Sequence, residues 1–162
     1  MKKIKIGYFA DGGWSHKAFE KIINDSLIEI CFIVPRNGTK DHTLKNYSEK
    51  YNIDYLFPVK LNDPSFKGVV EKYQCDLFVS MSYNQIFRPN IIEIPKLGII
   101  GSHPTELPKY RGRAPIPWTI IKKLSKSALT FFYIQEGVDD GDIFAQEFFF
   151  SRQRMGESCS LS

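Results

Sequence analysis

The chain has 162 residues, of which 43% are hydrophobic and 25% are charged, so it is long enough for one globular domain with an ordinary core. Its net charge of +4 comes from 22 basic and 18 acidic residues that are scattered along the chain, which permits anionic ligands without indicating a DNA-binding module. No apolar run is long enough for a membrane span, and the N-terminal segment is too polar for a signal peptide, so we expect a soluble, cytoplasmic protein with no membrane partner.

The first half of the chain predicts alternating strands and helices. Ile4–Phe9 is a short apolar strand that ends at the turn signal Asp11-Gly12-Gly13, and Ser15 is a suitable N-cap for a helix to about Ile23. The same reasoning predicts a strand over Ile28–Val34, a helix over Thr43–Tyr51, a strand over Tyr55–Val59, a helix that opens at Asp63-Pro64 and a strand over Leu77–Met81.

The second half continues the alternation. It predicts a short helix within Asn84–Ile94, a strand over Gly98–Ser102, a helix from Pro115 to about Lys123, and strands over Ala128–Ile134 and Ile143–Phe149. The strands are apolar along most of their length, which is typical of a mostly parallel sheet covered on both faces. We therefore predict one doubly wound α/β domain over residues 1–150, followed by a polar, poorly ordered tail over residues 151–162.

Polar loops follow three of the predicted strands at their carboxyl ends. They are Asp11–Trp14, Ser82–Gln85 and Ser102–Thr105. Ligands of doubly wound sheets bind at this edge, so we expect the three loops to share one rim. A fourth loop, residues 136–142, carries several carboxylates beside two glycines and is expected to fold over the same rim.

Several familiar site types are missing from the sequence. There is no G-x-G-x-x-G motif, no phosphate-binding P-loop and no G-x-S-x-G motif, which disfavours a nucleotide cofactor bound in the Rossmann manner and a covalent acyl-enzyme. The three cysteines, Cys31, Cys75 and Cys159, are too far apart in the sequence to indicate a disulfide framework or a metal site. His103 stands out instead, because Pro104 follows it and a histidine near a carboxylate is suited to proton transfer between two bound substrates.

Two motifs resemble those of a known family. "GSHPTELPKYRGRAPIPW", residues 101–118, is similar to the active-site signature of the formyltransferases that use 10-formyltetrahydrofolate, and "GVDDGDI", residues 137–143, is similar to their aspartate motif. The resemblance implies a Rossmann-like domain, a folate co-substrate and no metal. It also implies that an amine attacks the formyl carbon directly, that His103 stabilises the oxyanion, and that Asp139, 36 residues later, orients the histidine and helps to remove the proton of the amine.

The chain departs from the family pattern at one catalytic position. Relatives carry an asparagine two residues before the histidine, where this sequence has Gly101. Asn84, from the neighbouring rim loop, is our candidate for the missing amide donor. The remaining predicted folate-binding residues are Ser82, Tyr83, Gln85, Ile86, Gly137, Val138 and Asp140, and the predicted acceptor-binding residues are Asp11, Gly12, Trp14, Lys109, Tyr110, Arg111 and Arg113.

The resemblance leaves the acceptor open. Arg111–Pro115 is closer to the form found in enzymes that act on nucleotide-linked amino sugars, and 162 residues leave no room for the C-terminal domain of a methionyl-tRNA formyltransferase, so the sugar amine is our first choice. The alternatives are a methionyl-tRNA formyltransferase-like enzyme, a hydrolase that releases formate, and a non-catalytic domain that binds folate or a nucleotide sugar. The family continues with a further helix after residue 150, so the core looks truncated, and a second copy of the chain is a candidate to cover the exposed face as a homodimer.

Overall fold

The computed structural model describes residues 2–58 and 60–150. These residues form seven strands: β1 (Ile4–Ala10), β2 (Ile28–Pro35), β3 (Asp54–Tyr55), β4 (Leu77–Met81), β5 (Ile99–His103), β6 (Lys126–Tyr133) and β7 (Ile143–Phe150). The helices are α1 (Gly13–Ile22), α2 (Thr43–Tyr51), α3 (Pro64–Glu71), α4 (Pro89–Ile92) and α5 (Pro115–Ile121).

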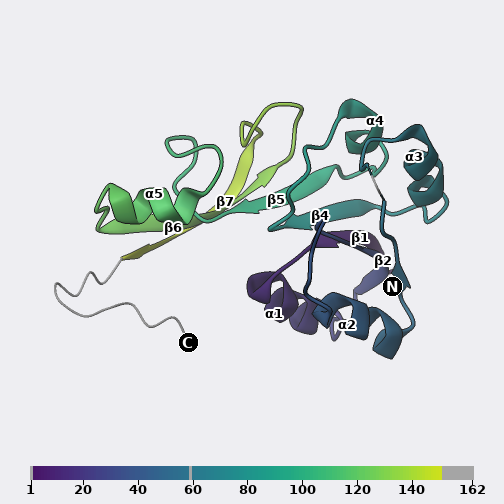
Figure 1. Ribbon diagram of the computed structural model, residues 1–162. Helices are drawn as coiled ribbons and strands as arrows, with labels where there is room; N and C mark the ends of the chain where they lie inside the picture. The colour runs from purple at the N-terminus through teal and green to yellow at the C-terminus, as the bar shows by residue number, and fades with distance from the viewer. Residues whose placement is uncertain (1, 59, 151–162) are drawn as a thin grey trace.

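The strands form one sheet in the order β3-β2-β1-β4-β5-β6-β7 (Figure 1). The five strands from β3 to β5 are parallel to one another, while β6 is antiparallel to β5 and β7 is antiparallel to β6. Helices α1 and α2 lie on one face of the parallel part, and α3 and α4 lie on the other. The predicted doubly wound, mostly parallel α/β fold is therefore confirmed.

The core consists of two apolar clusters, one on each face of the sheet. Successive residues of a strand point to opposite faces, so β1 places Tyr8 in one cluster and Phe9 in the other. The near-continuous apolar character of β1 thus reflects burial on both faces. Gly7 is needed for this packing, because a Cβ atom at position 7 would lie 2.4 Å from the ring of Phe32.

The first helix begins earlier than its sequence signal. Gly12, with a φ of 81°, is the N-cap of α1, and Ser15 is buried inside the helix, where its hydroxyl donates a hydrogen bond to the Gly12 carbonyl at 2.7 Å. The prediction that Ser15 caps the helix is wrong, because its hydroxyl donates to the turn instead of accepting from the first helical N–H groups.

Two other predicted elements are shorter than expected. The strand predicted over Tyr55–Val59 covers only Asp54–Tyr55, and Val59 lies outside the described residues. The short helix covers only Pro89–Ile92, because residues 82–88 form a loop. The predicted tail, residues 151–162, and Cys159 within it also lie outside the described residues.

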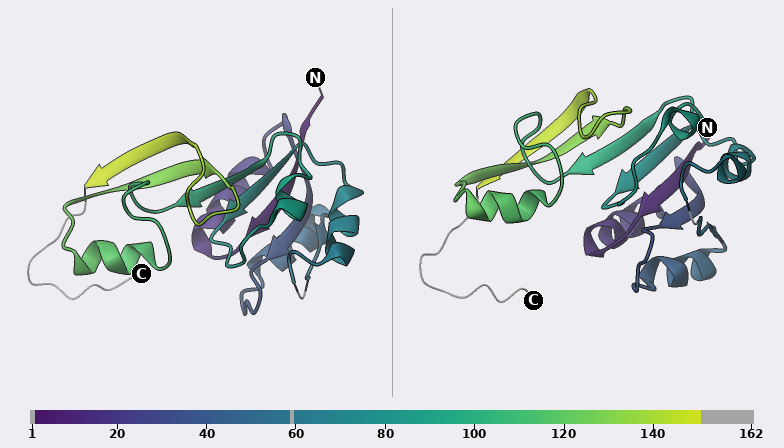
Figure 2. Two further views of the ribbon diagram at one scale, coloured as in Figure 1. Left: turned by 90° about the horizontal axis from the view of Figure 1, so that it is seen from above. Right: turned by 45° about the horizontal axis from the view of Figure 1, so that its top comes forward.

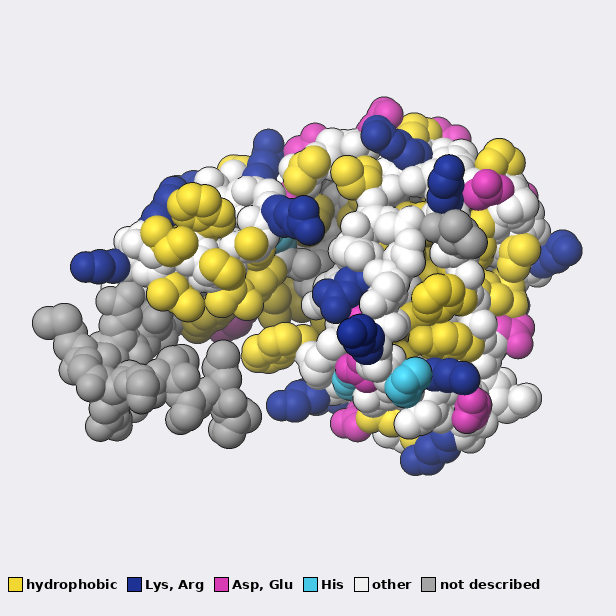
Figure 3. Space-filling model, in the orientation of Figure 1, with side chains coloured by type: hydrophobic (Ala, Val, Ile, Leu, Met, Phe, Trp, Pro, Cys, Tyr) yellow, Lys and Arg dark blue, Asp and Glu magenta, His cyan; other side chains and the backbone are white. Residues whose placement is uncertain are grey.

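The antiparallel end of the sheet extends beyond the rest as an arm (Figure 2). Only the second half of β6, residues 130–133, pairs with β5, whereas residues 126–129 pair with β7 alone. We use "the arm" for three parts of the chain: helix α5, residues 126–129 of β6, and residues 147–150 of β7, which pair with them. No residue of α5 is buried, and hydrophobic side chains gather over this end of the molecule in Figure 3. No helix within the described residues is long and apolar enough to cross a membrane.

Candidate active site

The site lies at one rim of the sheet, as the polar loops predict. Strands β1, β4 and β5 are adjacent and parallel, so the loops that follow them leave the same edge. The loop over residues 135–142 reaches this rim differently. It follows β6, which runs antiparallel to β5 and ends beside Ile99 and Ile100. Glu136 forms a 3.7 Å ion pair with Arg88 of the loop after β4, and Asp139 reaches His103 at the end of β5.

His103 ends β5 and is the central group of the site. Its residue is only 6% exposed, and its Nε2 lies 2.9 Å from the carbonyl oxygen of Tyr110. A carbonyl oxygen accepts only, so Nε2 must carry the proton of this hydrogen bond. The other ring nitrogen, Nδ1, faces Oδ2 of Asp139 at 3.6 Å. The structure therefore brings the predicted histidine and aspartate side by side, and their catalytic role stays a prediction.

Asp139 joins two loops. Its Oδ2 accepts a 2.9 Å hydrogen bond from the backbone N–H of Gly112, and its backbone has a φ of 50°, in the left-handed region. Its Oδ1 has no hydrogen-bond partner among the described residues. The turn also explains Gly141 in the same loop, because a Cβ atom at this position would lie 1.7 Å from the backbone carbonyl oxygen of Tyr133.

A buried polar network holds the loop that carries the Tyr110 carbonyl. The hydroxyl of Thr105 donates to the same carbonyl at 2.9 Å. Thr130 of β6, fully buried, donates its hydroxyl proton to the Thr105 carbonyl at 2.7 Å and accepts from the N–H of Leu107. Gln146 of β7 donates to the Thr130 hydroxyl and to the Leu107 carbonyl. The two antiparallel strands therefore fix the loop in front of His103. Sequence reasoning missed this network, because threonine and glutamine in strands give no distinctive signal.

The position of the missing asparagine is filled by an apolar side chain. A Cβ atom at Gly101 would lie 3.1 Å from two carbon atoms of Ile134 and 3.3 Å from the ring of Phe132. Asn84 donates its side-chain N–H to the carbonyl of Asn37 at 3.3 Å, toward β2. No hydrogen bond links Asn84 to His103 within the described residues, so its role as the third catalytic group stays a prediction.

The predicted folate-binding residues divide into inward and outward groups. Tyr83 packs its ring against Phe9, and burial raises its pKa above the usual range, while Gln85 accepts a 3.0 Å hydrogen bond from the N–H of Leu61. These two side chains fix the loop after β4. Ser82, Ile86, Gly137, Val138 and Asp140 are exposed, with Ile86 at 51% and Val138 at 56%. They remain available to a ligand between the two loops.

The predicted acceptor-binding residues gather in two places. Lys109, Tyr110, Arg111 and Arg113 line one hollow, which is described below. At the end of β1, Asp11 is buried, accepts from the N–H of Gly12 and pairs with the guanidinium of Arg36 at 3.0 Å. Trp14 is 75% exposed in the first turn of α1.

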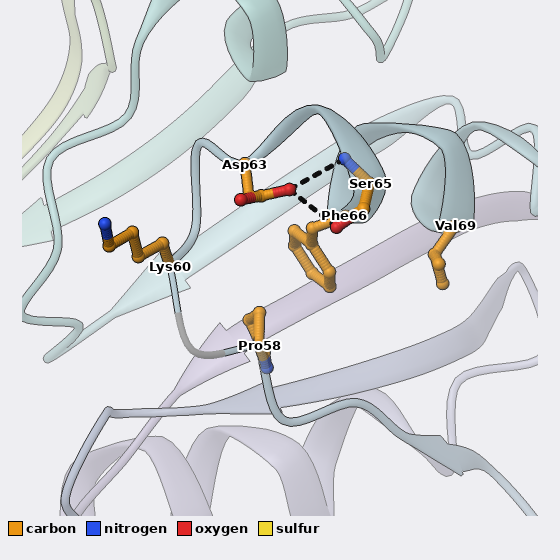
Figure 4. Close-up of a pocket in the computed structure, with 6 residues that line it drawn as sticks. All are labelled: Pro58, Lys60, Asp63, Ser65, Phe66 and Val69. Carbon is orange, nitrogen blue, oxygen red and sulfur yellow. Dashed lines mark hydrogen bonds between the residues drawn. The ribbon is translucent and has the colours of Figure 1, made fainter.

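Two further features were not predicted. Asp11, His16 and Asp41 form the only group of potential metal ligands within the described residues, but Arg36 already supplies a cation to Asp11 there. A hollow of about 430 Å³ lies at the start of α3 (Figure 4). The one carboxylate that lines it belongs to Asp63, the N-cap residue of α3. This carboxylate accepts hydrogen bonds from the backbone N–H and the hydroxyl of Ser65. Neither feature includes His103.

Comparisons with known proteins are consistent with this geometry. Residues 34–149 match the family described as "Formyl transferase". The methionyl-tRNA formyltransferase of Syntrophus aciditrophicus is 40% identical over 104 residues, which are 64% of this chain and 33% of that protein. The methionyl-tRNA formyltransferase of Mycoplasma genitalium is 31% identical over 153 residues, which are 90% of this chain and 49% of that protein. The chain therefore spans a third to a half of the length of these relatives.

Solved structures share the fold at low sequence identity. The phosphoribosylglycinamide formyltransferase from Anaplasma phagocytophilum superposes with a TM-score of 0.80 at 18% identity, over 94% of this chain and 75% of that one. A formyltetrahydrofolate deformylase from Pseudomonas syringae gives a TM-score of 0.75 at 20% identity, over 95% of this chain and 53% of that one.

Proposed function

The chain belongs to the formyl transferase family, and we propose that it transfers a formyl group from 10-formyltetrahydrofolate to the amine of methionyl-tRNA. The pairing of His103 with Asp139, in a site held by backbone groups, is the observation that carries the proposal. The choice of acceptor rests on the relatives, whose names are methionyl-tRNA formyltransferase.

The relatives favour this acceptor over the nucleotide-linked amino sugar that the sequence suggested first. Part of that choice rested on the absence of room for a C-terminal domain. Because the chain spans only a third to a half of these relatives, its length carries no information about such a domain.

The site residues suit the donor. When bound, 10-formyltetrahydrofolate supplies a formyl carbon that an amine can attack. Ile86 and Val138 present exposed aliphatic side chains from two loops that the Arg88–Glu136 ion pair joins. Apolar side chains with nearby backbone polar groups are the usual lining of a site for a flat heterocycle. We assign the binding of the donor to these loops.

The catalytic pair manages the proton and the developing charge. An amine that attacks a formyl carbon must lose a proton, which finally passes to the leaving nitrogen. Oδ1 of Asp139 and Nδ1 of His103, which faces Oδ2 of Asp139, are the positions that can take up this proton and return it. With a second proton at Nδ1, the imidazole is a cation balanced by Asp139, and a cation here stabilises negative charge on the formyl oxygen.

An acceptor panel tests the proposal. The purified chain is incubated with 10-formyltetrahydrofolate and, separately, with methionyl-tRNA, glycinamide ribonucleotide, a nucleotide-linked amino sugar or no acceptor. We expect formylation of methionyl-tRNA. Transfer to the amino sugar alone, or release of formate without an acceptor, would replace the proposal with the corresponding alternative.

Asp139→Asn tests the role of the charge. The amide oxygen can still accept from Gly112, so the loop keeps its link while the negative charge beside His103 is lost. We expect kcat/KM for formyl transfer to fall by about 10² to 10⁴, the usual share of positioned acid–base catalysis. Asp142→Asn, an exposed carboxylate in the same loop that belongs to no predicted site, is the matched control and should retain activity. A change of less than threefold in Asp139→Asn would contradict the assigned role.

A further inference from the structure

A hollow with an unusual lining lies beside the catalytic pair. It has a volume of about 240 Å³, and we call it the basic hollow. Its lining residues are Lys109, Tyr110, Arg111, Arg113, Pro115, Trp118 and Lys122. Four of them are cationic, two are aromatic and none is acidic. The sequence analysis assigned three of these cations to an acceptor but did not single out Trp118 or Lys122.

Most of the positive charge in the basic hollow is not neutralised by the protein. Lys109 pairs with Glu106 at 2.7 Å. Arg111 and Arg113 are exposed and form no ion pair or hydrogen bond with any residue in the ranges 2–58 and 60–150. Lys122 lies 5.2 Å from the ring centre of Tyr110 and has no carboxylate partner in the same ranges. Three cations are therefore open to an anionic ligand, and arginine is suited to bidentate contacts with phosphate.

The loop that lines the basic hollow also builds the catalytic site. Its residues alternate: the carbonyl of Tyr110 and the N–H of Gly112 bind His103 and Asp139, while Lys109, Arg111 and Arg113 contribute side chains to the hollow. A ligand bound to these cations thus contacts residues that are direct chain neighbours of Tyr110 and Gly112, whose backbone groups bind His103 and Asp139.

Trp118 adds a stacking surface. It lies in α5, 53% of its surface is exposed, and it forms no ring contact with another aromatic residue among those described. An exposed indole beside uncompensated cations is the usual combination for single-stranded nucleic acid, where phosphates meet the cations and a base stacks on the ring.

We propose that the basic hollow binds the single-stranded 3′ end of the tRNA acceptor, with phosphates at Arg111 and Arg113 and a base stacked on Trp118. This inference rests on the proposed function, because it assigns a place to that acceptor. A nucleotide-linked sugar shares the phosphate and base chemistry, so the test must separate the two sources.

The first test measures RNA binding without any chemistry. A fluorescently labelled RNA that ends in ACCA, with no amino acid attached, is titrated with the chain in the absence of a formyl donor, and anisotropy gives the Kd. Trp118→Ala should weaken binding about tenfold, within the range for loss of one stacked base. Arg111→Ala combined with Arg113→Ala should lower the slope of log K against log salt by about 1.4, since each single-strand phosphate contact contributes roughly 0.7.

A charge-matched control removes the same number of cations elsewhere. Lys72 and Lys96 are exposed and lie outside the basic hollow, so Lys72→Ala combined with Lys96→Ala should leave the slope unchanged. An equal loss of slope in this control would show unspecific attraction and overturn the proposal. Displacement of the RNA by an equal concentration of a nucleotide-linked amino sugar would also overturn it.

A second test observes the stacking residue directly. The chain has only two tryptophans, so in Trp14→Phe all tryptophan fluorescence comes from Trp118. We expect the same RNA to quench this emission with the Kd found by anisotropy, and an unchanged emission at saturation would reject stacking. RNA binding without formyl transfer would reject the proposed function alone. Transfer to methionyl-tRNA that survives the Arg111, Arg113 and Trp118 substitutions unchanged would reject the hollow alone.

Discussion

Individual residues of the site are held mainly by backbone groups. Tyr110 orients His103 through its carbonyl, and Gly112 orients Asp139 through its N–H. Any residue type could supply these backbone groups. The sequence therefore points to the histidine and the aspartate but not to the groups that orient them. The pair was predicted from the resemblance of two motifs to those of a known family, of which the motif around His103 is long and specific. The third group was not predictable in the same way, because position 101 has no side chain.

Gly101→Asn tests why that position is glycine. The new Cβ atom would press against Ile134 at 3.1 Å, so we expect the variant to lose about 1 to 3 kcal/mol of unfolding free energy, as overpacked cores do. Urea denaturation measures this loss. Ile134→Ala opens the same space, so the double variant should be more stable than the sum of the single changes by about 1 kcal/mol. Strict additivity would mean that Ile134 is not what excludes the asparagine.

At the scale of elements, the antiparallel strands β6 and β7 hold the loop that follows His103 through hydrogen bonds to Thr105 and Leu107. The hydroxyl of Thr130 makes three hydrogen bonds, one as donor and two as acceptor, which uses its full capacity. Because β6 and β7 both contribute to this network, the position of the loop depends on their register.

Thr130→Val removes this hydroxyl at nearly constant volume. The carbonyl of Thr105 and the amide of Gln146 lose a partner, so we expect a loss of about 1 to 3 kcal/mol of unfolding free energy. Formyl transfer should fall as well, since the loop that holds His103 is less constrained. Thr119→Val, which removes one hydrogen bond to Pro115 within exposed α5, should change stability by less than about 0.5 kcal/mol. Equal effects of the two substitutions would argue against a special role for the network.

The elements themselves show how far pattern reasoning extends. Apolar runs located β1, β2, β4 and β5 well, because burial on both faces of the sheet leaves a clear signal. The run that located β7 has another origin, because nearly all residues of β7 are exposed. The antiparallel direction of β6 and β7 relative to their neighbours could not be predicted, because the apolar pattern of a strand does not depend on its direction in the sheet. The start of α1 was also misjudged, because a serine near a helix start can donate inward as Ser15 does.

At the scale of the whole molecule, the arm is the least covered part. Along β7, Ile143, Phe144, Phe148, Phe149 and Phe150 are all exposed, and β7 is an edge strand of the sheet. Aromatic side chains on an open edge favour association with other chains. The homodimer expected from the sequence stays a prediction.

Phe149→Lys tests that prediction in solution. We expect the unmodified chain to associate in sedimentation velocity experiments at micromolar concentration, and the substitution to shift it toward the monomer by placing a charge on the edge strand. Leu97→Lys replaces a comparably exposed apolar residue away from the arm and should leave association unchanged. A monomeric unmodified chain would remove the arm as a self-association surface.

The alternation along residues 109–113 has an evolutionary consequence. The contacts of this loop with His103 and Asp139 use only main-chain atoms, so substitutions at Lys109, Arg111 and Arg113 leave those contacts in place. If the loop binds the acceptor as proposed, substitutions of these side chains would change what it recognises and leave the contacts of His103 and Asp139 intact. One scaffold could in this way diversify its acceptors by side-chain replacement alone.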